Sequence, residues 1–157
     1  MITIRAATTD DAQKISDLIR ILAPYCTLEP DGTGAEQFFA SISREAIEGY
    51  ILSPHFAYFV AVRDEQVIGV AALRDISHVY HLFIAPQFHG LGYARVLWNH
   101  LRQHAQQLGP VTRLTVNSSS YAEKMYRHFG FEPTAEKQIM HGLAFIPMQI
   151  LLTELTD

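Results

Sequence analysis

The segment HVYHLFIAPQFHGLGYA, residues 78–94, decides the fold. Its first eight residues are a mostly apolar run that predicts a strand, Pro86 ends the run, and Gly90 and Gly92 lead into a helix. The helix is indicated by the apolar spacing of Ala94, Val96, Leu97, Trp98 and Leu101. Glycines permit a close approach, and the first-turn N–H groups of a helix are unpaired. The turn therefore predicts an anion site, most plausibly for phosphate.

The same turn excludes two familiar nucleotide motifs. A G-x-G before a helix is equally compatible with a simple structural corner. Residues 78–94 lack the G-x-G-x-x-G spacing of a dinucleotide fold, and they lack the G-K-S/T of a P-loop. An anion site at this turn therefore belongs to another fold class.

Outward from this segment, the chain reads as one mixed α/β domain over residues 1–157. Two apolar runs precede it at spacings that suit an antiparallel meander, and a region of helical periodicity that forms one broken helix or two short ones lies before them. Further strands are expected at 2–6, 56–63, 67–73, 111–116 and 143–152, and helices from 12 to 22, within 38–51, from 94 to about 108 and at 122–129. The sheet is expected to be largely antiparallel.

Composition excludes several classes of protein. The chain is 48% hydrophobic and 18% charged, with a formal charge of −4 and scattered basic residues, so a nucleic-acid partner is not expected. The longest apolar runs are of strand length, so no membrane association is expected. Cys26 is the single cysteine, which allows no intrachain disulfide, and no secretion signal is visible, so we expect a cytoplasmic protein.

Two blocks of the sequence resemble the GNAT superfamily of N-acetyltransferases. His89-Gly-Leu-Gly-Tyr-Ala94 is similar to the family's Q/R-x-x-G-x-G/A signature, and Ala122-x-x-x-Tyr126-x-x-x-Gly130-Phe131 is similar to its second block. The order of elements also matches over nearly the whole chain. The resemblance implies an α+β domain with a mixed, mostly antiparallel sheet of about seven strands, about four helices and a splayed cofactor cleft.

The resemblance also implies acetyl-CoA as co-substrate and direct transfer of its acetyl group to a primary amine of a small molecule or peptide. The backbone of Leu82, Phe83 and Ile84 would pair with the pantetheine arm, and the turn would hold the pyrophosphate through His89, Gly90, Leu91, Gly92, Tyr93 and Ala94. Asn117 and Ser119 lie where the family places polar groups near that arm, although both also suit turn and helix-cap roles. His89 replaces the family's Gln or Arg, so anion binding should rest more on backbone amides.

Direct transfer requires a base for the acceptor ammonium and an acid for the leaving thiolate. Tyr126 occupies the position of the family's tyrosine and is the expected acid. His78 is the first choice of base and shares a strand face with Tyr80, whereas His81 faces the other way unless a bulge reverses the alternation. The resemblance implies such a bulge, so His81 is a second candidate. A water chain without a dedicated base is the third possibility.

The acceptor side is expected between residues 25 and 39. Tyr25, Phe38 and Phe39 would line an apolar wall, with Tyr80 beside them, and Glu29, Asp31 and Glu36 would attract a cation. The same residues also suit a solvated loop and a core. No metal is expected, because the pair His100 and His104 has no third ligand in view. A noncatalytic acyl-CoA-binding regulatory module is the alternative function, and a homodimer is left open.

Overall fold

The computed structural model describes residues 1–152 as an α+β fold built on one mixed sheet. The strands follow the order β1-β2-β3-β4-β5-β8-β6, and β7 pairs with β8. The strands are β1 (Thr3–Ala6), β2 (Phe56–Arg63), β3 (Gln66–Arg74), β4 (His78–Ile84), β5 (Arg113–Ser118), β6 (Glu132–Pro133), β7 (Gln138–Met140) and β8 (Leu143–Leu151). The α-helices are α1 (Ala12–Leu22), α2 (Glu36–Ser41), α3 (Arg44–Leu52), α4 (Tyr93–Leu108) and α5 (Glu123–Phe129).

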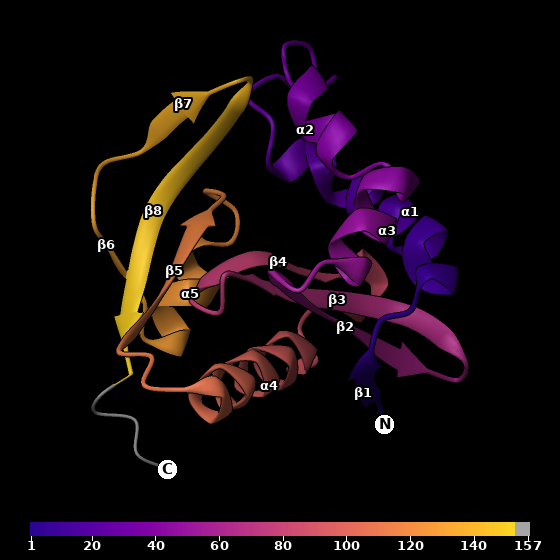
Figure 1. Cartoon of the computed structure of the whole chain (residues 1–157). Helices are drawn as coiled ribbons and strands as arrows, with labels where there is room; N and C mark the ends of the chain where they lie inside the picture. The colour runs from indigo at the N-terminus through magenta and orange to yellow at the C-terminus, as the bar shows by residue number, and fades with distance from the viewer. Residues whose placement is uncertain (153–157) are drawn as a thin grey trace.

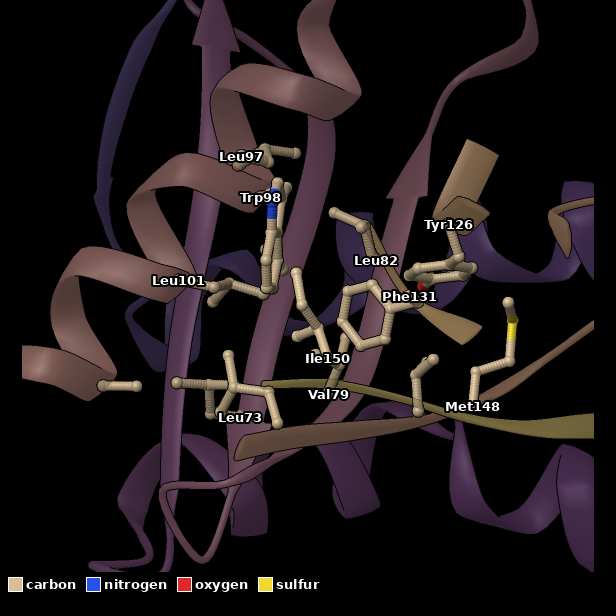
Figure 2. Close-up of a cluster of buried hydrophobic side chains, with 14 of the residues drawn as sticks. Leu73, Val79, Leu82, Leu97, Trp98, Leu101, Tyr126, Phe131, Met148 and Ile150 are labelled. Carbon is tan, nitrogen blue, oxygen red and sulfur yellow. The ribbon is translucent and has the colours of Figure 1, made fainter. Parts of the chain in front are cut away.

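Helices cover both faces of the sheet, as Figure 1 shows. On β3, Val70 and Ala72 pack toward α1 and α3, while Ala71 and Leu73 pack toward α4. This alternation is the period-2 pattern of a strand that is buried on both faces. Figure 2 shows the cluster on the α4 side, where the ring of Trp98 lies among aliphatic side chains.

The predicted elements agree closely with the structure, which confirms the expected fold class. The acidic start signal at Thr8–Asp11 is present, because the Thr8 N–H donates to Asp11 Oδ2 at 2.8 Å. The region predicted as one broken helix or two short ones is two helices, α2 and α3. The described residues contain eight strands rather than about seven, and the additional short strands are β6 and β7, which are only two and three residues long. They contain five α-helices rather than about four, because α2 and α3 are separate helices.

The β4–β5 pair is the irregular part of the sheet. It is the parallel pair, and its register holds two residue pairs, His78 with Thr115 and Val79 with Val116. Beyond Val79 no residue of β4 is registered with β5. On the other side of β4, Leu73 pairs with Val79 and Ala72 with His81, so Tyr80 is an extra residue that forms a bulge.

Candidate active site

The separation of β5 from β4 leaves backbone groups of β4 without a strand partner. The Ala85 N–H donates to the Ile68 carbonyl of β3, and the polar groups of successive residues in a strand point to opposite sides. The N–H and C=O groups of Leu82 and Ile84 therefore point away from β3, toward the gap beside β5. These are the groups that an extended, peptide-like molecule would pair with.

The glycine turn follows directly on this open edge. Gly90 and Gly92 have φ angles of +79° and +83°, which glycine adopts without steric cost. A Cβ added at either position would meet no heavy atom within 4 Å, so the space above the turn is open. Gly92 is the N-cap of the 16-residue helix α4 and has no side chain to cap it. The free N–H groups of its first turn suit an anion.

The open edge and the glycine turn line one cleft of about 350 Å³, here named the glycine-turn cleft. Most of the residues predicted to bind the cofactor line it, together with Tyr25, which was predicted for the acceptor side. Those that line it are Leu82, Phe83, Ile84, His89, Gly90, Gly92, Tyr93, Ala94, Ser119 and Tyr25. Leu91 is exposed and does not line it.

His89 bridges the open edge and the opposite wall of this cleft. Its Nε2 lies 2.6 Å from the Ile84 carbonyl oxygen, which can only accept, so Nε2 carries the proton. In the neutral ring Nδ1 then accepts from the Tyr121 hydroxyl at 3.2 Å. The ring of Tyr121 stacks on Tyr25 with centroids 4.2 Å apart. In this structure the Ile84 carbonyl of the open edge therefore already accepts a hydrogen bond from His89.

A second cleft of about 500 Å³, here named the histidine cleft, lies on the other side of Phe83. Cys26, Phe83 and Ser119 line both clefts, so the two meet at these residues. Besides Phe83 and Ser119, the predicted site residues that line it are Phe38, His78, Tyr80, His81 and Asn117. Glu29, Asp31, Glu36 and Phe39 line neither cleft.

Both candidate histidines of β4 reach the histidine cleft, because the bulge at Tyr80 restores His81 to the side of Tyr80. His78 Nδ1 lies 2.8 Å from Thr115 Oγ1, and burial, with Arg74 nearby, lowers the pKa of His78 to about 4. His81 is 5% exposed, its Nδ1 lies 2.6 Å from the Tyr58 hydroxyl, and burial lowers its pKa to about 3. Both rings are therefore neutral at pH 7.

Tyr126 belongs to the buried cluster on the α4 side and lines neither cleft, although Met125, its neighbour on α5, lines the glycine-turn cleft. It is 5% exposed and packs on Phe129 and Phe131, and Figure 2 shows its ring beside Phe131. Its hydroxyl makes no hydrogen bond to any residue within 1–152. Burial, with Cys26 close by, raises the pKa of Tyr126 well above its usual value of 10. Burial also raises the pKa of the Cys26 thiol, to about 11.

Sequence reasoning missed several residues that line the clefts. Cys26 was not among the predicted site residues, and neither were Arg74, Tyr121 and Met125. None belongs to a motif, so only the folded chain brings them to the site. Ser119 serves the turn role that was left open, because its Oγ accepts from the Ala122 N–H at 3.1 Å in the turn before α5, and it also lines both clefts.

In the described part of the chain no group of three or more His, Cys, Asp and Glu side chains could hold a metal ion. His100 and His104 instead pack edge-on against Phe59. None of the helices within residues 1–152 is long and apolar enough to cross a bilayer.

Comparison with solved structures identifies the same fold in acetyltransferases. The N-acetyltransferase PaiA of Thermoplasma acidophilum, solved with coenzyme A, matches with a TM-score of 0.78 at 16% identity over 96% of this chain and 99% of its own. A GCN5-related N-acetyltransferase of Rhodopseudomonas palustris matches at 0.79 and 19% identity, over 96% and 95%. An aminoglycoside 6'-N-acetyltransferase with coenzyme A matches at 0.73 and 13% identity, over 99% of both chains. At these identities the likeness shows the fold alone.

The sequence itself carries the family assignment. A comparison with curated protein sequences finds no match. The family model described as the acetyltransferase (GNAT) domain matches residues 26–152, which is most of the chain and includes both the glycine turn and the block around Tyr126. The chain therefore belongs to the GNAT acetyltransferase domain family.

Proposed function

We propose that the protein is an acetyl-CoA-dependent N-acetyltransferase that transfers the acetyl group directly to a primary amine of a small molecule or peptide. One observation carries the proposal. A cleft suited to CoA and a second cleft meet at Cys26, Phe83 and Ser119, beside the open edge of β4. Direct transfer requires this arrangement, because the amine must reach the thioester from a separate entrance.

The residues of the glycine-turn cleft fit CoA in two respects. The outward N–H and C=O groups of Leu82 and Ile84 can pair with the amides of the pantetheine arm, once His89 releases the Ile84 carbonyl. The open space above Gly90 and Gly92 admits the diphosphate to the start of α4. When bound, acetyl-CoA supplies an acetyl group activated as a thioester.

We propose Tyr126 as the proton donor to the leaving thiolate. Its raised pKa keeps the hydroxyl protonated at physiological pH, and the hydroxyl has no competing partner within residues 1–152. The surroundings of Cys26 disfavour a sulfur anion, because burial raises the pKa of its thiol to about 11. The same burial would make a thiolate released beside Cys26 more basic and so more in need of a proton, and Tyr126 is the side chain that we propose supplies it.

His81 is better placed than His78 to receive the proton of the acceptor amine. His81 adjoins Leu82 at the open edge, whereas His78 lies four residues earlier, about 13 Å along an extended strand. To act as a base, His81 must donate its Nδ1–H to the Tyr58 oxygen and leave Nε2 unprotonated. An imidazole with a pKa of about 3 holds a proton only briefly, so the proton passes on to water in the histidine cleft.

Release of free thiol from acetyl-CoA across a panel of amines tests the function. Transfer to at least one amine, with acetylated product found by mass spectrometry, supports the enzyme. The alternative, a noncatalytic acyl-CoA-binding module, predicts CoA binding by calorimetry without thiol release. A cytoplasmic location and a homodimer remain predictions that fractionation and light scattering can check.

A further inference from the structure

The histidine cleft is lined by positive and neutral groups. Its charged or titratable lining consists of Arg74, His78, His81 and His141 together with Cys26 and Tyr80, and none of its lining residues is an Asp or Glu. His78 and His81 are neutral at pH 7 because burial lowers the pKa of each. Arg74 therefore provides the fixed charge of the cleft, and that charge is positive.

The guanidinium of Arg74 has no carboxylate partner. It lies 5.4 Å from the centre of the Tyr80 ring, and within residues 1–152 no Asp or Glu oxygen approaches it to 4.0 Å. The neighbouring Asp75 lies 3.5 Å from His55 Nδ1 and outside the lining, although its charge acts on the pKa of His78 in the opposite sense to Arg74. The acidic residues expected to attract a cation, Glu29, Asp31 and Glu36, line neither cleft.

We propose that the acceptor amine carries an anionic group, a carboxylate or a phosphate, and that Arg74 binds it. This inference rests on the proposed function, since it describes the acceptor of that reaction. A guanidinium pairs with either anion through two parallel hydrogen bonds. The same charge disfavours an acceptor with a second cationic group, because no carboxylate in the lining offsets it.

The position of Arg74 also indicates how far the anion lies from the amine. Arg74 sits over Tyr80, and Tyr80 is two residues before Leu82, which is about 7 Å along a strand. An α-amino acid, whose two charged groups are adjacent, does not span this distance. An amine separated from its anion by several carbon atoms does, and Phe38 and Phe145 provide apolar surface for them.

Matched acceptors of one length test the inference. The kcat/KM for acetyl transfer is measured with 5-aminopentanoate, its uncharged amide and 1,5-diaminopentane, and with 3-aminopropyl phosphate to compare the two anions. We expect the carboxylate to exceed the diamine by about 10-fold or more, the scale of a charged hydrogen bond that is partly exposed to solvent. An equal or higher value for the amide or the diamine than for both anions overturns the inference.

Variants of Arg74 assign the preference to this side chain. Arg74→Met keeps the length of the stem and should bring the carboxylate and the amide to within about threefold, mainly through KM. Arg74→Glu should reverse the order in favour of the diamine. Arg113→Met, at an exposed arginine of β5 that lines neither cleft, should keep the wild-type ratios. Ratios unchanged in Arg74→Met overturn the inference.

One result separates this inference from the proposed function. If the wild-type protein binds CoA and acetylates no amine of a broad panel, the proposed function fails. Calorimetric titration of 5-aminopentanoate and 3-aminopropyl phosphate into the CoA complex then decides the inference by itself. Binding that Arg74→Met weakens about 10-fold supports the anion site, and absence of binding, or equal binding by the variant, overturns it.

Discussion

Replacing Tyr126 with phenylalanine tests the proton donor while leaving the packing around it in place. The ring contacts with Phe129 and Phe131, at centroid distances of 6.0 and 5.3 Å, do not involve the hydroxyl. That hydroxyl also makes no hydrogen bond to residues 1–152. The free energy of unfolding should therefore change by no more than about 1 kcal/mol, the scale of one net hydrogen bond.

The effect of Tyr126→Phe on the reaction should be much larger. Burial raises the pKa of the nearby Cys26 thiol to about 11, so a thiolate leaving at this place is a poor leaving group without a proton. Loss of the donor should lower kcat by about 10²-fold or more, with CoA affinity unchanged. Thiol release at saturating acetyl-CoA measures kcat, and calorimetry measures the affinity.

The pH dependence gives a second reading of the same residue. A donor works only while protonated, and the pKa of Tyr126 is raised above 10, so the wild-type kcat should not fall on the alkaline side up to pH 10. Two results would refute the assignment. One is a kcat for Tyr126→Phe within about threefold of the wild-type value, and the other is a wild-type alkaline limb below pH 10 that the variant lacks.

Three further changes test the cofactor turn, the sheet and the buried histidine. Gly92→Asp and Gly92→Asn bear the same backbone strain at a φ of +83°, and an added Cβ has no neighbour within 4 Å, so the two variants are a matched pair. Gly92→Asp should lose CoA affinity about 10-fold more than Gly92→Asn by calorimetry, because only the carboxylate repels the diphosphate. Gly69→Ala places a carbon 2.7 Å from Ile84 Cδ1, so the free energy of unfolding in urea should fall by about 1–3 kcal/mol, whereas Gly49→Ala, with open space, should not lower it. The free energy of unfolding should also fall as pH drops from 6.5 toward 3, because the unfolded His81 binds a proton that the folded one excludes, and a folded His81→Gln variant should show a flatter slope.

Much of the fold follows from local patterns in the sequence. The apolar runs at 56–63 and 67–73 became β2 and β3 with boundaries shifted by one residue at most, because period and turn residues act over short distances. The helix predicted to stop near Gly109 ends at Leu108. The short strands β6 and β7 were not predicted, since two or three residues carry too little pattern to indicate a strand.

The site was less predictable, because it depends on contacts between distant segments. No local signal marks the point where β5 leaves β4, or the extra residue at Tyr80 that brings His81 to the histidine cleft. Arg74 looks like any charged residue at a strand end, and its proposed role rests on the absence of acidic residues in the lining around it. Composition does not show such an absence, since the whole chain is acidic, with a charge of −4.

The bulge at Tyr80 accounts for the geometry of both clefts at once. Parallel pairing with β5 stops at Val79, the residue immediately before it. A bulge bends and twists its strand, so β4 turns away from β5 at this point. The backbone N–H and C=O groups of Leu82 and Ile84 are therefore left without a strand partner. The extra residue also places Tyr80 and His81 on one side of the sheet, while Leu82 returns to the core below. A regular strand would close the edge against β5 and turn His81 into the α4-side core, so the irregularity in β4 is what allows two clefts to meet there.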